Sequence, residues 1–221
     1  MWTLYFAALL LQSAAPQAVT PAEIVDRVQK FYDRTQDIKA DFRQTLTNQA
    51  FGRKQVSDGI VRFKKPGKMR WDYATPEKKL FISDGKVLWL YEPEDRQAFR
   101  QTLSESALPS ALSFLTGQGR LDKEFDATRA EDPAHFGDPG DYVIRLTPKT
   151  PTAQYKSIVL DVDPRTFQVK QTFVFDTQNN VNQVSFSKVT LNQKIADNVF
   201  TWSPPPGTKI VKPAQVGSGG D

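Results

Sequence analysis

The sequence predicts a mainly β protein, in the form of a strongly curved antiparallel sheet with helices on its concave, hydrophobic side. Short segments rich in β-branched and aromatic residues follow one another between residues 38 and 91. Turn sequences separate them, among them SDG at 57–59, PG at 66–67 and SDGK at 83–86, which are typical of β-hairpins. Two stretches with helical apolar spacing interrupt this pattern, so we expect helices packed on the sheet.

The clearest hairpin runs from Ile60 to Tyr73, where apolar and polar residues alternate. Alternate side chains of a strand point to opposite faces of the sheet. One face therefore carries the odd-numbered residues Val61, Phe63, Met69, Trp71 and Tyr73, and the other face is basic and solvated. Lys65 shares the parity of the apolar face, and a cation at the rim of an apolar interior needs a partner. We expect a lined cavity with a polar latch at Lys65.

The 221-residue chain suits one large β domain, predicted here over residues 19–211. Residues 1–18 carry an apolar run followed by small residues, which is typical of a secretory signal peptide. A retained N-terminal anchor is the alternative. The Gly-rich residues 212–221 are predicted to form a flexible tail. Export of a chain with no cysteine means that packing, without disulfides, must stabilise the fold.

Two stretches are predicted to form a lid over the apolar face. The first is a helix with Thr20 as N-cap, Pro21 in its first turn and Glu23 at the capping-box position. The second is a short amphipathic helix within residues 104–117, interrupted by Pro109. The lid underside is expected to consist of Ile24, Val28, Phe31, Leu108, Leu112 and Leu115.

The remaining chain is predicted to be mostly strands. Strand pieces in residues 122–149 are split by an acidic loop at 131–141, and residues 155–176 form a hairpin around Asp163. In the second strand of that hairpin, Phe167, Val169, Phe173 and Phe175 are expected to share one face. The segment from Ser203 is Pro-rich and is expected to be extended.

Catalytic chemistry has little support in the sequence. His135 is the only histidine and falls in the acidic loop, where a solvated residue is expected. Asp161 and Asp163 have the spacing of one strand face, but a solvated strand edge is the favoured interpretation. Nucleophile, phosphate-binding and zinc motifs are absent from the sequence, so we expect no enzyme, no cofactor and no metal. The charge of +4 is too small and too scattered to indicate nucleic-acid binding.

Several segments together resemble one family. They are ADFRQTLT (40–47), GIVRFKKPGKMRWDY (59–73), LFISDGKVLWLYEPEDRQAF (80–99), LSFLTG (112–117), RLTPK (145–149) and FTWSPPPG (200–207). In this order they are similar to the periplasmic outer-membrane lipoprotein carrier family of the LolA type, from about Val19 to Val211. The resemblance implies an unclosed antiparallel β-barrel whose opening is covered by helices.

The resemblance also implies a function and its partners. A member of this family would be a monomer in the periplasm that accepts triacylated lipoproteins from an inner-membrane ATP-driven transporter and delivers them to an outer-membrane receptor. Lys65 stands where the family usually has the Arg that joins barrel and lid, and Met69 stands at a position linked to cargo acceptance. The predicted acyl-chain lining is Val61, Phe63, Met69, Trp71, Leu80, Ile82, Leu88, Leu90 and Phe99.

Two alternatives remain at this stage. A module of the same shape could bind free lipids or sense lipoproteins in envelope signalling. An enzyme acting on envelope lipids or glycans would have to use His135 or Asp161, the only plausible catalytic residues.

Overall fold

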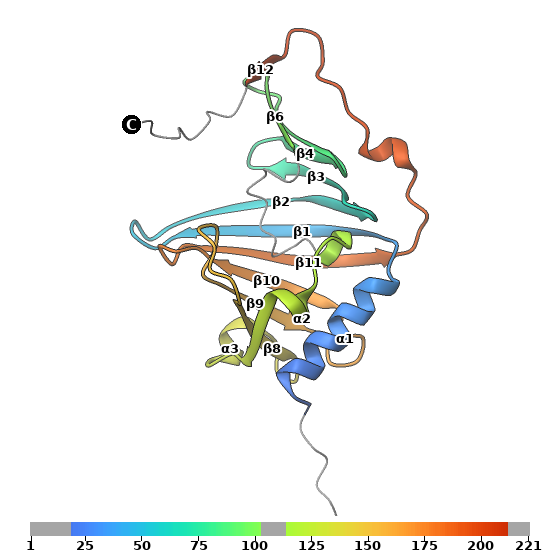
Figure 1. Ribbon diagram of the computed structural model, residues 1–221. Helices are drawn as coiled ribbons and strands as arrows, with labels where there is room; N and C mark the ends of the chain where they lie inside the picture. Colours follow the sequence, from blue (N-terminus) through green and yellow to red (C-terminus); the bar gives the residue numbers. More distant parts are fainter. Residues whose placement is uncertain (1–18, 103–113, 212–221) are drawn as a thin grey trace, which may run out of the picture.

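The computed structural model describes residues 19–102 and 114–211, and its central feature is one sheet of twelve strands (Figure 1). The spatial order is β12-β6-β5-β4-β3-β2-β1-β11-β10-β9-β8-β7. The two end strands, β12 and β7, do not pair with each other, so the sheet is not closed into a barrel. All neighbouring strands are antiparallel except β12 and β6, which are parallel.

The elements have the following bounds. The strands are β1 (Asp37–Asn48), β2 (Arg53–Lys64), β3 (Lys68–Thr75), β4 (Lys79–Asp84), β5 (Val87–Glu92), β6 (Gln97–Thr102), β7 (Phe125–Arg129), β8 (Tyr142–Pro148), β9 (Ser157–Val162), β10 (Val169–Phe175), β11 (Val181–Leu191) and β12 (Lys209–Val211). The helices are α1 (Pro21–Arg34), α2 (Leu121–Glu124), α3 (Pro133–Phe136) and the 3₁₀ helix η3 (Asp197–Phe200). None of the helices within the described ranges has the length and apolar composition needed to span a bilayer.

Helix α1 begins as the sequence predicts. The Thr20 hydroxyl accepts a hydrogen bond from the Glu23 backbone N–H, and the Glu23 carboxylate accepts one from the Thr20 backbone N–H. This capping box satisfies two of the backbone donors that a helix N-terminus leaves without partners. The helix packs its apolar stripe on the sheet, and we call the sheet face that it contacts the inner face.

The strand registers show which residues share the inner face. One row of paired positions crosses six neighbouring strands from β1 to β6, and every member is apolar. Its members are Ala40, Val61, Trp71, Phe81, Leu90 and Phe99. Because directly paired residues point to the same side of a sheet, this row forms an apolar band across half of the inner face.

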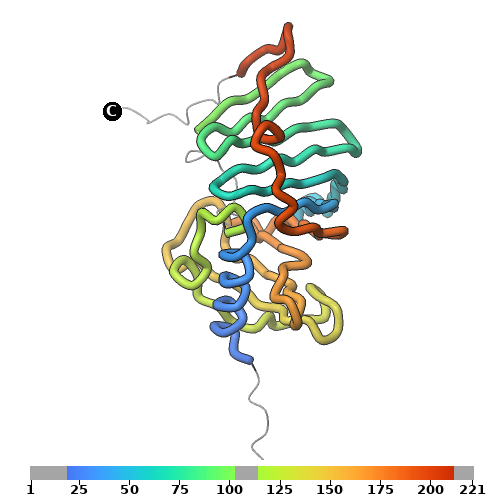
Figure 2. The backbone as a smooth tube through the Cα atoms, turned by 90° about the vertical axis from the view of Figure 1, so that its right-hand side faces the viewer, coloured from blue at the N-terminus to red at the C-terminus, as the bar shows by residue number. Residues whose placement is uncertain are grey.

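The opposite, outer face of β3–β5 is covered by residues 192–208, which we call the C-terminal strap. Figure 2 shows the strap (red) crossing the strands of the upper half of the sheet, while α1 (blue) lies against the lower half. The Asp37 carboxylate, which is buried, accepts hydrogen bonds from the backbone N–H groups of Gln193 and Ile195 and so fixes the start of the strap.

The strap then contacts the sheet through both charge and aromatic packing. Asp197 forms ion pairs with Lys64 and Lys68, at 2.6 and 3.0 Å. Further along, Trp202 packs edge-on against Trp89, with 5.4 Å between ring centroids, and the strap ends by adding β12 to β6. The Pro-rich segment is therefore extended, as expected, and part of it is a structural cover.

A β-bulge corrects one prediction about the β9–β10 hairpin. The register of β10 against β9 shifts between Val169 and Gln171. An extra residue at a bulge reverses which side the following residues face. Val169 therefore packs in the inner core, whereas Phe173 belongs to a separate outer cluster under α3. The expectation that both residues share one face was wrong.

Removal of the Phe200 side chain should show what the strap contributes to stability. Phe200 is 2% exposed in η3, which contacts β3 and β4. We expect Phe200→Ala to lower the free energy of unfolding by about 3–5 kcal/mol, because a large buried ring is replaced by a cavity. Urea denaturation measures this change. Phe51→Ala, at a position that is 75% exposed, is the matched control and should change the value by less than about 0.5 kcal/mol. Equal effects of the two variants would contradict a structural role for the strap.

Candidate functional site

Aromatic rings concentrate at the centre of the inner face. Phe42 from β1 packs edge-on against Trp71, at 4.8 Å between centroids, and against Tyr73, at 4.9 Å. Phe63 and Phe186 contact the same Trp71 ring from β2 and β11, at 5.6 and 6.4 Å. Four strands therefore supply one continuous aromatic surface. Gly59 permits it, because a Cβ there would lie 2.7 Å from the Phe42 ring.

The lid lies over one end of this surface. Ile24 and Val28 of α1 are fully buried in the inner core, and Leu115, just before Gly117, is 5% exposed. Phe31 is half-buried and packs against the same core. These residues hold the positions expected of the lid underside. Leu108 and Leu112 lie outside the described residues, and residues 114–116 form a single 3₁₀ turn.

A small cavity lies under the described part of the lid. A cavity of about 20 Å³ lies between α1, β1, β2, β10 and β11, and its lining includes Phe31, Tyr32, Phe63, Leu115, Val169 and Phe186. This volume suffices for about one water molecule. The lid side chains of Phe31, Tyr32 and Leu115 thus lie close to the sheet at this end of the inner face.

The inner face is more open at its other end, near the β1–β2 turn. Two hollows of about 270 and 290 Å³ lie there, and Leu46 and Asn182 line both. A chain of hydrogen bonds crosses the first hollow, in which the Tyr73 hydroxyl donates to Gln44 and the Gln44 amide donates to Asn182. Burial raises the pKa of the Tyr73 hydroxyl to about 12. The inner face therefore changes from aromatic at its centre to polar at this end, and we call this part of the inner face, from Trp71 to the two hollows, the groove.

Lys65, the predicted latch, lies between the sheet and α1. Its ammonium donates hydrogen bonds to the backbone carbonyls of Tyr32 and Asp33, at 2.5 and 3.1 Å. These carbonyls belong to the last turn of α1, where the helix dipole favours a positive charge. Burial lowers the pKa of Lys65, while the nearby Asp33 carboxylate acts in the opposite direction. The partner that a cation at the apolar rim requires is thus the C-terminal end of α1.

The β2–β3 turn also contacts the second lid piece. The Gly67 backbone N–H donates to the carbonyl of Thr116 at 3.1 Å. Gly117 has a positive φ of +74°, and a Cβ there would lie 2.8 Å from the Lys65 side chain. One turn of the sheet therefore holds both described parts of the lid.

Two buried polar side chains of α1 add further connections that were not predicted. The Tyr32 hydroxyl accepts a hydrogen bond from the Val169 backbone N–H on β10. The Gln29 side chain accepts one from the Leu121 backbone N–H at 2.9 Å, which joins α1 to α2. Gln29 and Tyr32 are only 3% exposed each, so these bonds are shielded from water. The sequence did not indicate these contacts, because Gln29 and Tyr32 resemble any other residues of an amphipathic helix.

The registers divide the predicted lining into two groups. Val61, Phe63, Met69, Trp71, Leu88, Leu90 and Phe99 lie on the inner face. Leu80 and Ile82 do not, because they pair with Asp72 and Arg70 and therefore point to the outer face, under the strap. That part of the prediction was wrong. The residue missed between them is Phe81, which pairs with Trp71.

The candidate catalytic residues lie apart from the inner face. His135 is exposed on α3. Asp161 is fully buried on the outer side of β9, where its carboxylate accepts a hydrogen bond from Gln171 at 3.1 Å. The expectation of a solvated strand edge at Asp161 was wrong, because β8 and β10 flank it and the loop after α3 passes over it at Gly137. No group of three or more potential metal ligands occurs among residues 19–102 and 114–211.

These features define a class of protein: an unclosed β-sheet with an apolar inner face that is covered by a lid. Comparison of the sequence with known families makes the assignment specific. The chain belongs to the family described as outer membrane lipoprotein carrier protein LolA, whose model matches residues 33–203.

Individual relatives agree with this assignment. The chain is 27% identical over 193 residues to the outer-membrane lipoprotein carrier protein of Dechloromonas aromatica, covering 86% of this chain and 88% of that protein. It is 26% identical over 206 residues to the protein of the same name from Chromobacterium violaceum, covering 93% and 94%. Among solved structures, an uncharacterized conserved protein from Thermus thermophilus has a TM-score of 0.54 at 11% identity, covering 86% and 98% of the two chains, which shows a similar fold.

The burial of Asp161 should produce a pH-dependent stability. Burial, together with the nearby Asp141 carboxylate, raises the pKa of Asp161 from its ordinary value of 3.8 to about 6, although its hydrogen bond from Gln171 acts in the opposite direction. The folded state therefore holds this proton more tightly than the unfolded state. The resulting stabilisation is present below pH 3.8 and is lost as the pH rises through about 6.

Thermal unfolding between pH 5 and pH 8 measures this effect. We expect the wild type to lose about 1 kcal/mol over this range, or roughly 2–4 °C in Tm. Asp161→Asn should remove this loss. Asp163→Asn is the control, since hydrogen bonds from Thr166 lower the pKa of Asp163 and so place its effect below this window. A wild-type slope that persists in Asp161→Asn would contradict the assignment.

Proposed function

We propose that this protein is a soluble, non-enzymatic carrier in the periplasm, which holds the acyl chains of lipoproteins against the inner face and carries them from the inner to the outer membrane. The observation that carries the proposal is the apolar row from Ala40 to Phe99 on the inner face, together with a lid that packs on one end of this face and is joined to the β2–β3 turn by hydrogen bonds. Membership of the lipoprotein carrier family supports it.

The physical requirement on such a carrier is large. Each methylene group withdrawn from water contributes roughly 0.8 kcal/mol, so a triacylated lipoprotein does not leave a membrane without an apolar shelter. The aromatic surface around Trp71 offers that shelter, and the flexible thioether of Met69, which lies on the same face, suits acyl chains of different lengths.

Entry of an acyl chain requires the lid to move. The cavity of about 20 Å³ under the described part of the lid is far too small for an acyl chain. The side chains of Phe31 and Leu115 would have to leave the inner face, and the Lys65 hydrogen bonds would break with that movement. Closure restores both the packing and the hydrogen bonds, so the closed lid competes with cargo. This competition keeps binding loose enough for release.

The proposed pathway needs two partners. An ATP-driven transporter in the inner membrane would supply triacylated lipoproteins, and an outer-membrane receptor would take them. We propose that residues 1–18 direct export, that residues 19–211 form one carrier domain with residues 212–221 as its tail, and that the carrier works as a monomer without a cofactor or nucleic acid. Residues 1–18 and 212–221 lie outside the described part of the chain.

A release assay tests the function. The purified protein is added to spheroplasts that retain newly made triacylated lipoproteins, and the supernatant is analysed for complexes. We expect soluble one-to-one complexes of carrier and lipoprotein. If no lipoprotein is released while the protein still extracts free lipid, the carrier function is excluded and a lipid-binding or sensing role replaces it.

Lys65→Leu tests the proposed competition between lid closure and cargo. The variant loses the two hydrogen bonds to the Tyr32 and Asp33 carbonyls, each worth about 1.5–3 kcal/mol for a charged donor. Lid closure then competes less strongly with cargo, so we expect lipoproteins to be bound at least tenfold more tightly and not passed on. Transfer from purified complexes to outer-membrane vesicles measures the outcome.

Two control variants accompany this measurement. Lys65→Arg keeps the positive charge and the donors and should transfer cargo. Lys86→Leu removes an exposed lysine from the neighbouring β4–β5 turn and should behave as the wild type does. Normal delivery by Lys65→Leu would contradict the role of Lys65 as a latch.

A further inference from the structure

The tip of the β1–β2 hairpin presents an unusual amount of apolar surface to solvent. Phe51 is 75% exposed, and Leu46 and Val56, on the two strands below it, are 40% and 45% exposed. Of the four large hydrophobic residues that are exposed in the described ranges, these are three; the fourth is Ile210 in β12. Figure 1 shows that this hairpin end extends beyond the ends of the neighbouring strands.

The apolar tip is accompanied by positive charge alone. Residues 42–57 contain no Asp or Glu, and Arg53 and Lys54 follow Phe51 after a single glycine. Both are exposed, and within residues 19–102 and 114–211 neither forms an ion pair. The carboxylate of Asp176, in the adjacent β10–β11 turn, accepts hydrogen bonds from Gln178 and Asn180 of its own turn. The two cations at the tip therefore have no acidic partner in the described part of the chain.

The tip is held in a defined position. Strand pairing continues to Asn48 and Arg53, the residues on either side of the turn. Within the turn, the Phe51 backbone N–H donates to the Asn48 side chain at 3.1 Å, and the Gln49 backbone N–H donates to Asn180 in the neighbouring turn at 3.0 Å. The exposure of Phe51 is thus a feature of an ordered hairpin.

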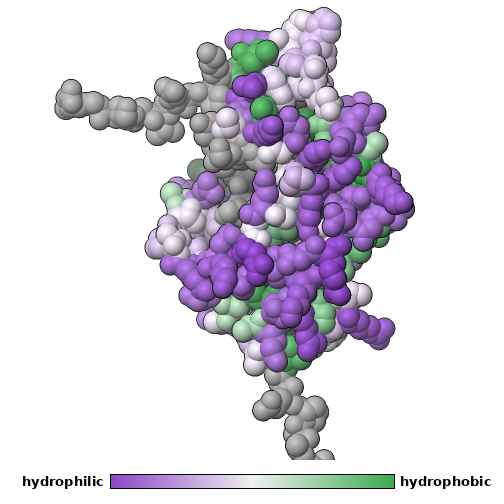
Figure 3. All heavy atoms as spheres, turned by 45° about the vertical axis from the view of Figure 1, so that its right-hand side comes forward, coloured by the Kyte–Doolittle hydropathy of each residue, from purple (hydrophilic) through white to green (hydrophobic). Residues whose placement is uncertain are grey.

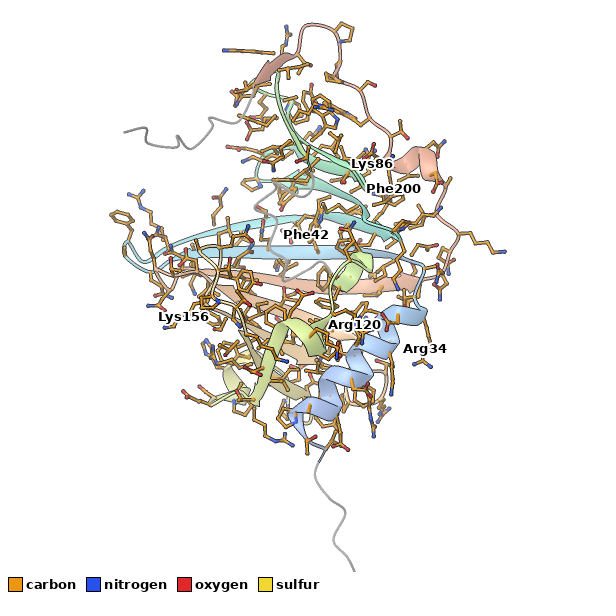
Figure 4. All side chains as sticks on the ribbon, viewed as in Figure 1. Arg34, Phe42, Lys86, Arg120, Lys156 and Phe200 are labelled. Carbon is orange, nitrogen blue, oxygen red and sulfur yellow. The ribbon has the colours of Figure 1, made fainter. Side chains whose placement is uncertain are left out.

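The surface of the molecule is more polar on the face shown in Figure 3. The face in Figure 3 is largely hydrophilic, and its hydrophobic residues form small separate patches. Lys156, just before β9, lies toward the same end of the molecule as the hairpin tip, whereas Lys86 lies toward the opposite end (Figure 4). Lys156 is exposed as well, so it adds to the positive charge at the hairpin end.

We propose that the β1–β2 tip docks on a membrane surface that contains anionic lipids. Phe51 enters the interface between headgroups and acyl chains, and Arg53 and Lys54 contact lipid phosphates. Phe, Trp and Leu are the residues with which peripheral proteins enter this interface, and basic residues are attracted to its negative charge. The exposed ring of Phe51 matches the apolar part of this interface. The cations of Arg53 and Lys54, with no acid in the same segment, match its negative charge.

Docking in this way would also orient the inner face. Leu46, at the base of the tip, lines both hollows at the open end of the groove, and one of them also contains Tyr73 and Phe81. A tip seated in the membrane therefore brings the open end of the inner face to the lipid surface. This inference concerns the empty protein, and it holds or fails independently of the proposed function.

Vesicle binding without any lipoprotein tests the proposal. The chain has no cysteine, so Gln49→Cys provides a single site for an environment-sensitive fluorophore beside Phe51. With vesicles of phosphatidylglycerol and phosphatidylethanolamine at low salt, we expect a blue shift of the label and co-sedimentation of the unlabelled protein. With phosphatidylcholine vesicles, or in 1 M salt, where charges are screened beyond about 3 Å, both signals should be at least tenfold weaker.

Variants show whether the tip is responsible. We expect Phe51→Ala to lower the partition coefficient about tenfold, and Arg53→Gln and Lys54→Gln to lower it about fivefold each. Ile210→Ala and Lys86→Gln are the matched controls, an exposed apolar residue and an exposed lysine away from the tip, and should bind as the wild type does. All five positions are exposed, so we expect each variant to fold, and the thermal transition of each verifies this.

Two results would overturn the proposal. One is the absence of binding to anionic vesicles at low salt, which would leave the tip as a contact for another protein. The other is binding that Phe51→Ala leaves unchanged, which would show adsorption through another basic surface. The release assay distinguishes docking from carrier function. If Phe51→Ala no longer binds vesicles but still forms lipoprotein complexes, the variant has lost docking and kept the carrier function.

Discussion

The inner face of the sheet is apolar over six strands, and the rest of the structure depends on the need to keep that surface out of water. Trp71, with Phe42 and Phe63 against it, exposes too much hydrocarbon to remain solvated. Over β1, β2, β10 and β11 the lid supplies the cover, with Ile24 and Val28 fully buried. In the function proposed above, cargo and lid would be alternative covers for this surface, so that binding and release would be two directions of one exchange.

The polar contacts that hold the lid are of two kinds, one at the rim and one in the buried part of α1. Lys65 reaches the lid through hydrogen bonds to backbone carbonyls at the rim, which is in part exposed to water. Deeper connections, such as Tyr32 to Val169, lie in the buried part of α1. The rim contacts are therefore more accessible to water than the buried ones.

The outer face of the sheet is covered by packing that does not involve the lid. The strap covers β3–β5 with Phe200 and Trp202, and α3 covers a second cluster around Phe173. The outer face also contains Asp161, an acidic residue that is fully buried and whose pKa is raised by this burial.

The predictions that were wrong share one origin, because alternation along a strand does not identify the side that faces inward. Leu80 and Ile82 were assigned to the inner face because they are apolar and alternate, but Phe81 between them is apolar as well. At Val169 a bulge reversed the parity within a single strand. Asp161 looked solvated because alternation within β9 does not show that β8 and β10 flank it on both sides and that the loop at Gly137 passes over it.

The sequence by itself determined the mainly β class, the capped helix at Thr20, the hairpin around Trp71 and the position of Lys65 between apolar neighbours. These depend on local periodicity and on residues within one or two turns. Only the tertiary structure decided which face each later strand turns inward, which carbonyls receive the Lys65 ammonium, and that residues 192–208 close the outer face. Those outcomes depend on register and on contacts between distant segments, and local patterns carry no information about either.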